Sequence, residues 1–227
     1  MGNSFWKIIW TSRDLVVITS IIIAVFSLFL VSAVFLHLEP ASTTLVINSG
    51  LFIAIIATVF TYSKRKGIAL QDIGFTNVSK KWMFLTILIG LGVMVIGGSL
   101  SSLLAKLLGL EVGNLSLMGE AMSDKMWLNL LNLKLLTAIL LPVAEETFFR
   151  GVIFRYLRQN NTFIKSALIS SLIFSLVHFD ISVLPFTFLL GFVSAWVFEK
   201  TRSLISSFIV HITVNNLAVN FLLLNIF

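Results

Sequence analysis

The chain has 227 residues, of which 58% are hydrophobic and 11% are charged, and its mean hydropathy is +1.03. A soluble domain carries about 25% charged residues, so this composition excludes an ordinary soluble enzyme and predicts an all-α, polytopic membrane protein. There are no cysteines, which excludes disulfide frameworks, thiolate metal sites and thiol nucleophiles. The net charge of +6 comes from basic residues in short loops, a pattern typical of membrane topology and not of nucleic-acid binding.

Apolar runs predict a transmembrane helix bundle of about seven spans in a single membrane domain, residues 1–227. In chain order the expected spans are 15–36, 44–62, 82–108, 128–158, 163–179, 184–199 and 203–226. The first run is too long for a signal-peptide core, so we interpret it as an uncleaved span. Segment 111–126 is expected to be a long external connection. The third span carries a small-residue face suited to close helix packing, formed by Gly90, Gly92, Gly97 and Gly98.

Charge in the connections predicts the orientation. Lysine and arginine gather in the N-terminal tail and after the second, fourth and sixth spans, whereas the other connections hold five of the ten acidic residues. Basic loops remain in the cytoplasm, so the N-terminus is expected there and the C-terminus outside.

Polar side chains stand inside or beside the apolar segments of the C-terminal third. A charged group at the centre of a bilayer helix costs about 2.5–3.5 kcal/mol, so such residues indicate function by default. The candidate site residues are Glu145, Glu146, Arg150, His178, His211 and Asn215.

The expected depths of these groups agree. Measured from the cytoplasmic end of each helix at 1.5 Å per residue, Glu145 lies about 20 Å deep and His178 about 23 Å deep. Asn215 lies about 18 Å deep and His211, one turn away on the same helix face, about 12 Å deep. Three helices can therefore bring a carboxylate, two imidazoles and an amide into one cluster.

Local spacing predicts different roles for Glu145 and Glu146. Glu146 and Arg150 are four residues apart on one helix face, the spacing of a favourable ion pair. Glu145 points about 100° away from Glu146 and is free for another partner. Pro142 removes a backbone donor and is expected to kink the helix beside Glu145.

Two reactions use these groups. In the first, Glu145 is the general base for a water molecule with help from His178, while His211 and Asn215 stabilise the oxyanion of a scissile amide. In the second, Glu145, His178 and His211 ligate a divalent metal such as Zn²⁺. Both predict amide hydrolysis within the membrane. The sequence contains no His-Glu-x-x-His, Gly-x-Ser-Gly or Gly-x-Gly-Asp motif, which excludes three other classes of intramembrane protease.

Three motifs carry a family resemblance. They are Glu145-Glu146-Thr-Phe-Phe-Arg150-Gly151, Phe174-Ser-Leu-Val-His178 and His211-Ile-Thr-Val-Asn215. In this order they resemble the motifs of the CAAX protease and bacteriocin-processing (CPBP, Abi) family of intramembrane proteases, which includes the type II CAAX prenyl proteases. The resemblance places the catalytic core of the family in residues 128–227.

The resemblance implies an intramembrane endopeptidase with a cavity around a catalytic glutamate. Glu145 would be the base, His178 its partner, and His211 with Asn215 the oxyanion-stabilising or metal-binding pair. It allows both a divalent metal cofactor such as Zn²⁺ and a metal-free glutamate mechanism. The expected partners are a peptide or membrane-protein substrate and the lipid bilayer, with no nucleic acid. Bacterial peptide processing or bacteriocin self-immunity at the plasma membrane is the expected setting, without a prenylated substrate.

Other interpretations of the same residues stay open. Glu145, Glu146 and Arg150 also suit a structural ion-pair network. His178 suits a helix-end residue at the external interface, and His211 with Asn215 suits interhelical hydrogen bonding. The alternative function is therefore a non-catalytic membrane immunity or regulatory protein that binds a peptide or partner. A proton-coupled transporter ranks last, because the hydropathy shows no paired halves.

Overall fold

The computed structural model describes residues 4–6, 8–110 and 126–226, and its regular structure in these ranges is helical throughout. Apart from its last position, the predicted external connection 111–126 lies outside the described residues. Three short elements accompany the long helices: η1 (Ser4–Trp6), α3 (Leu70–Ile73) and η4 (Ile181–Val183).

Five helical segments are long and apolar enough to cross a membrane. They comprise α1 (Ser12–Phe35), α2 (Pro40–Arg65), α4 (Lys80–Leu108), α10 (Leu184–Thr201) together with η4, and α11 (Leu204–Ile226). A shorter apolar helix, α9 (Phe163–Leu176), lies between them in the sequence. The chain is therefore a multi-pass, all-helical membrane protein, as the composition predicted.

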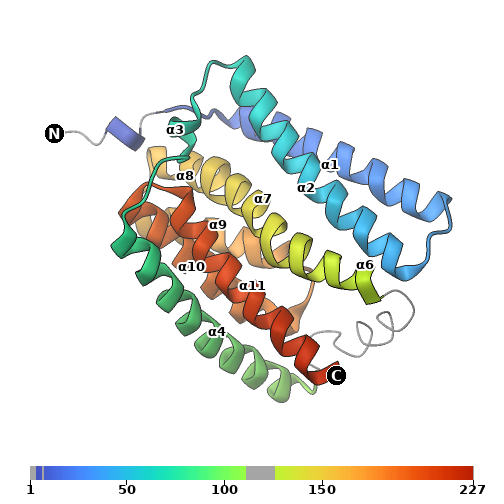
Figure 1. Cartoon of the computed structure of the whole chain (residues 1–227). Coiled ribbons are helices and arrows are strands. Elements are labelled where there is room, and N and C mark those ends of the chain that lie inside the picture. Colours follow the sequence, from blue (N-terminus) through green and yellow to red (C-terminus); the bar gives the residue numbers. More distant parts are fainter. Residues whose placement is uncertain (1–3, 7, 111–125, 227) are drawn as a thin grey trace.

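The predicted long helix at 128–158 runs as one rod built of five consecutive pieces (Figure 1). These are α6 (Met126–Leu131), η2 (Asn132–Leu140), α7 (Leu141–Phe148), η3 (Phe149–Phe154) and α8 (Arg155–Asn160). Both η2 and η3 are π-helical, and such wider turns are frequent at functional sites. With this rod the described residues contain about seven apolar helices, which confirms the predicted architecture.

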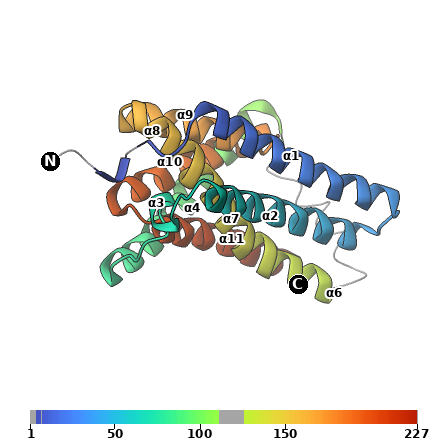
Figure 2. The ribbon, with the colours of Figure 1, turned by 90° about the horizontal axis from the view of Figure 1, so that it is seen from above.

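The rod is the inner element of the bundle. Its α7 and η2 segments contact α2 on one side and α11 on the other, and η3 contacts α9 and α10. Outside this layer, α1 packs on α2, and α4 packs on α10 and α11 (Figures 1 and 2). Side chains of α7 are thereby enclosed by neighbouring helices and largely screened from lipid.

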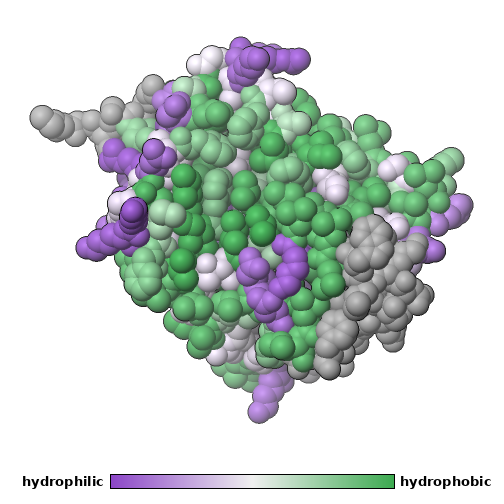
Figure 3. Space-filling view, viewed as in Figure 1, coloured by the Kyte–Doolittle hydropathy of each residue, from purple (hydrophilic) through white to green (hydrophobic). Residues whose placement is uncertain are grey.

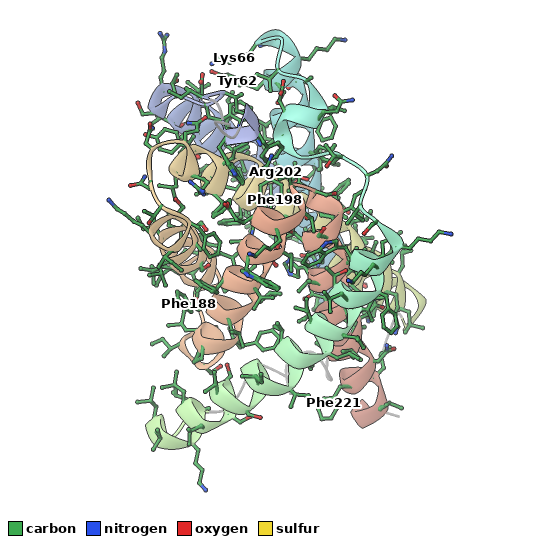
Figure 4. All side chains as sticks on the ribbon, turned by 90° about the vertical axis from the view of Figure 1, so that its left-hand side faces the viewer. Tyr62, Lys66, Phe188, Phe198, Arg202 and Phe221 are labelled. Carbon is green, nitrogen blue, oxygen red and sulfur yellow. The ribbon has the colours of Figure 1, made fainter. Side chains whose placement is uncertain are left out.

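The basic connections lie together at one end of the bundle. The N-terminal segment, α3 and α8 gather there (Figure 1). Hydrophilic surface lies at the ends of the molecule, and the mainly apolar belt between them is interrupted by a hydrophilic patch near the middle of this face (Figure 3). At the end with the basic connections, Tyr62 on α2 and Lys66, the residue that follows α2, lie next to each other (Figure 4), and both donate to the Asp14 carboxylate, at 2.8 Å and 2.5 Å. Shared placement of the basic loops agrees with the predicted alternation of the spans, and the cytoplasmic location of this end stays a prediction.

Two of the four glycines on the small-residue face of α4 pack closely against neighbouring helices. A Cβ added to Gly90 would lie 2.9 Å from Thr213 on α11, and one added to Gly97 would lie 2.7 Å from the Phe186 ring on α10. Gly92 and Gly98 face open space instead. Close helix approach is therefore confirmed at two of the four glycines.

The two contrasting glycines of α4 give a matched test of this packing. Gly97→Ala is expected to destabilise the protein by about 1–3 kcal/mol, because Phe186 must shift to admit the methyl group. Gly98→Ala adds the same methyl group in open space and is expected to be neutral or stabilising by up to about 1 kcal/mol, since alanine favours helix. Thermal unfolding in detergent measures both; equal losses would contradict the packing role of Gly97.

Candidate active site

Glu145 and Glu146 occupy α7 between the two π-helical segments. Because successive helical residues differ by about 100° in direction, the two carboxylates face different surroundings. The Glu146 side chain is fully buried, whereas the Glu145 side chain is 19% exposed. The predicted division between a paired and a free glutamate is present in the structure.

Glu146 is the centre of a buried charge network. Its Oε2 lies 3.1 Å from Arg150 Nε, in the ion pair that their spacing predicted. Its Oε1 lies 2.8 Å from His211 Nδ1 on α11. A carboxylate paired with arginine can only accept, so Nδ1 carries the proton that is donated to Glu146. These two contacts offset the large cost of burying a charge among apolar helices.

Arg150 joins the network to two further helices. Its Nη2 donates to the Gly191 carbonyl on α10 at 2.8 Å, and its guanidinium carbon lies 4.8 Å from the centre of the Phe174 ring on α9. The arginine is itself fully buried. Glu146 and Arg150 together therefore hold the rod, α9, α10 and α11 in one arrangement.

Glu145 faces the other nitrogen of the same imidazole. Its Oε2 lies 3.7 Å from His211 Nε2, beyond direct hydrogen-bond distance and close enough for a bridging molecule. With Nδ1 protonated, a neutral His211 presents an acceptor at Nε2. The result is a row of four groups, Glu145, His211, Glu146 and Arg150, which we call the glutamate–histidine row.

His178 contacts Phe174, whose ring also contacts His211. The Phe174 ring centre lies 4.9 Å from that of His178 and 5.7 Å from that of His211. His178 Nδ1 donates to the Phe174 carbonyl at 2.7 Å, and the residue is exposed. The helix ends at Leu176, so the expected span to residue 179 is too long and His178 lies in the turn that follows. The contact described for the His178 ring is thus with Phe174, and direct help to Glu145 stays a prediction.

Asn215 contacts the backbone of the rod. Its Nδ2 donates to the Thr137 carbonyl at 2.9 Å. Asn48 on α2 lies on the other side, where it donates to Asn132 Oδ1 at 2.8 Å and to Thr137 Oγ1 at 3.3 Å. The expected cluster therefore forms in part: it contains the glutamates, Arg150 and His211, while Asn215 is attached to η2.

The three metal ligands expected on the second mechanism do not meet. Within residues 4–6, 8–110 and 126–226, no group of three or more acidic, histidine or cysteine side chains is arranged to hold a metal ion. His211 uses Nδ1 for Glu146, and both His211 and His178 contact the Phe174 ring. The set Glu145, His178 and His211 does not fit a metal in this arrangement.

Two backbone carbonyls of the site were not predicted from the sequence. The Gly191 carbonyl that receives Arg150 carries no signal in the sequence, because every residue has a carbonyl. The Thr137 carbonyl had one available signal, namely Pro142 five residues later, which cannot supply a π-helical hydrogen bond. Phe174 was expected to pack, and its ring contacts Arg150 and two imidazoles.

Comparison with known proteins gives consistent results. Residues 127–217 match a family model described as type II CAAX prenyl endopeptidase Rce1-like. Over 84 residues, 36% of this chain and 45% of the relative, the chain is 38% identical to the "UPF0177 protein YxdF" of Lactococcus lactis subsp. lactis (strain IL1403). Over 85 residues, 37% of this chain and 35% of the relative, it is 32% identical to the "Putative membrane peptidase YdiL" of Bacillus subtilis (strain 168).

These matches span less than half the length of either relative, and no solved structure matches the chain. The matched family segment contains all six predicted site residues together with the Pro142 and Gly151 positions that flank the first motif. Residues 127–217 are therefore similar to the Rce1-like type II CAAX prenyl endopeptidases, in agreement with the resemblance carried by the three motifs.

Proposed function

We propose that this protein is an intramembrane endopeptidase in which Glu145 activates the water that attacks a peptide bond. The glutamate–histidine row is the observation that carries the proposal: a partly exposed carboxylate faces an imidazole whose other nitrogen is fixed by a fully buried ion pair. The match of residues 127–217 to a family model of prenyl endopeptidases supports hydrolysis as the reaction class.

The row assigns a separate task to each group. Arg150 forms an ion pair with Glu146, and Glu146 fixes the ring orientation of His211 through Nδ1. Glu145 accepts a proton from water while the water oxygen bonds to the carbonyl carbon and the carbonyl oxygen becomes an oxyanion. When the C–N bond breaks, Glu145 returns that proton to the leaving amine. His211 Nε2, 3.7 Å from Glu145, can hydrogen-bond the water during this sequence.

A purely structural network explains only part of this arrangement. Glu146 and Arg150 form a buried ion pair, and His211 Nδ1 donates to Glu146 Oε1. Glu145 adds a second acidic group beside the same imidazole, at a depth where each charge is costly. A proton-accepting role accounts for that second group and its partial exposure.

The expected substrate is a peptide or a segment of a membrane-associated protein that reaches the site from the cytoplasmic side. The matching relatives come from bacteria, which supports a bacterial plasma membrane as the location. We propose peptide processing or bacteriocin self-immunity as the biological setting, in agreement with the small and strongly apolar chain.

The proposal is tested by comparing cells that produce the wild-type chain with cells that produce Glu145→Gln. New N-terminal peptide ends from membrane proteins or secreted peptides should appear only with the wild-type chain, and a purified candidate should then be cleaved by the protein in vesicles. If both chains yield identical peptide ends while both protect or signal equally, the protein is the non-catalytic partner-binding alternative.

Metal removal gives an independent prediction. Because the proposed ligands are not arranged around a common point, treatment with a strong chelator is expected to change the cleavage rate by less than about twofold. The purified protein should also contain much less than one Zn²⁺ per chain by elemental analysis. A loss of activity that is restored by one added equivalent of metal would contradict the metal-free mechanism.

A further inference from the structure

The Thr137 carbonyl has lost the donor that its own helix would supply. In η2 the hydrogen bonds run from each residue to the fifth residue before it, as shown by the Leu141 N–H that donates to the Leu136 carbonyl. The next donor in this register is residue 142, and it would donate to Thr137. Residue 142 is proline, which has no N–H. An unsatisfied carbonyl in a membrane bundle is costly, so a replacement donor is needed.

Asn215 supplies that donor from another helix. Its Nδ2 lies 2.9 Å from the Thr137 oxygen. One turn earlier on α11, His211 binds Glu146 on the same rod. Helix α11 is thereby attached to the rod at two points that flank Pro142, and Glu145 lies between the attachment points in the sequence.

We propose that Asn215 is a positioning residue that replaces the hydrogen bond missing at Pro142 and so fixes α7, with Glu145, against His211. The family resemblance instead implied an oxyanion ligand at Asn215. Asn215 Nδ2 carries two N–H groups: one donates to the backbone of η2, and the other is left for an oxyanion, so the test below separates the two roles. The effect on catalysis rests on the proposed function; the hydrogen bond itself does not.

We expect Pro142→Ala to compensate for the loss of stability and activity caused by Asn215→Ala. Asn215→Ala removes the substitute donor. Pro142→Ala introduces an N–H at residue 142, which can donate to the Thr137 carbonyl. Asn215→Ala alone is expected to lower Tm by about 3–6 °C and kcat by about 10–100-fold, with KM changed less than about twofold. In Pro142→Ala/Asn215→Ala both quantities should return to near those of Pro142→Ala alone, within about 2 °C and about threefold. Pro142→Ala itself should be tolerated, because alanine is the best helix former.

The neighbouring asparagine supplies the control. Asn216 Nδ2 donates to the Ile212 carbonyl of its own helix at 3.3 Å. Asn216→Ala therefore makes the same chemical change without touching η2, and its effect should not depend on residue 142.

Two results overturn the proposal. If the Tm loss of Asn215→Ala is unchanged on the Pro142→Ala background, Asn215 does not replace the proline donor. If Tm is restored and kcat is not, Asn215 acts on the reacting atoms and is not a positioning residue. If the wild-type chain cleaves no peptide, the proposed function fails, and the Tm comparison still decides whether the Asn215 hydrogen bond substitutes for Pro142.

Discussion

Replacement of Glu145 by glutamine is expected to lower kcat for peptide cleavage by about 10²–10⁴-fold, the usual contribution of a general base. Glutamine keeps the size of the side chain and cannot take a proton from water. Because Glu145 is 19% exposed and lies 3.7 Å from His211, its neutral replacement should leave the buried Glu146–Arg150 pair intact. KM should change little, and unfolding should occur within about 2 °C of the wild-type temperature.

Glu199 offers a matched control for this substitution. Its side chain is 17% exposed, close to the value for Glu145, and it pairs with Arg158 at 2.9 Å near the end of the bundle. Glu199→Gln should therefore retain the wild-type kcat while it tests the general effect of removing one half-buried carboxylate. Wild-type kcat in Glu145→Gln, measured on the same peptide in the same vesicles, would assign the base to another group.

Much of the site follows from spacing along single helices. The Glu146–Arg150 pair was predicted from four-residue spacing and is present at 3.1 Å. The choice of partner for His211 was not predictable in the same way. The sequence shows which residues share one helix face, whereas the rotation of α11 relative to α7 decides whether His211 Nδ1 contacts Glu145 or Glu146. Packing of the whole bundle sets that rotation.

The error at His178 has a different origin. The apolar run continues through Val177 and Phe179, so hydropathy extends the predicted span beyond its true end. The backbone instead leaves the helix after Leu176, and Phe179 adopts a positive φ of 52°. Membrane interfaces tolerate apolar side chains in turns, and composition therefore cannot locate such a helix end to within two residues.

Asn215 shows the limit set by backbone chemistry. Its four-residue spacing from His211 predicted a shared face correctly, and both residues contact the rod. Its partner was not predictable from side-chain types, because the acceptor is a carbonyl whose availability depends on the π-helical register of η2. A proline that follows a widened turn is the sequence feature that could indicate such a free carbonyl.

Replacement of Arg150 by methionine is expected to have the largest effect on stability, a loss of about 3–5 kcal/mol. The substitution leaves the Glu146 charge fully buried without its cation, and it removes the contacts with Gly191 and Phe174. Unfolding in detergent, followed by circular dichroism, measures the loss. Arg158→Met is the comparison, because Arg158 and Glu199 are 22% and 17% exposed and a solvated pair contributes about 0–1 kcal/mol.

Two causes of the stability loss in Arg150→Met, the unpaired Glu146 charge and the lost packing, can be distinguished by neutralising Glu146. If an uncompensated carboxylate causes most of the loss, Glu146→Gln/Arg150→Met should be more stable than Arg150→Met alone, even though it carries one more substitution. If lost packing against Phe174 and the Gly191 carbonyl dominates, the double variant should be no more stable than the single one. We expect the first result, because Glu146 would keep only His211 as a partner, and a single hydrogen bond does not offset a buried charge.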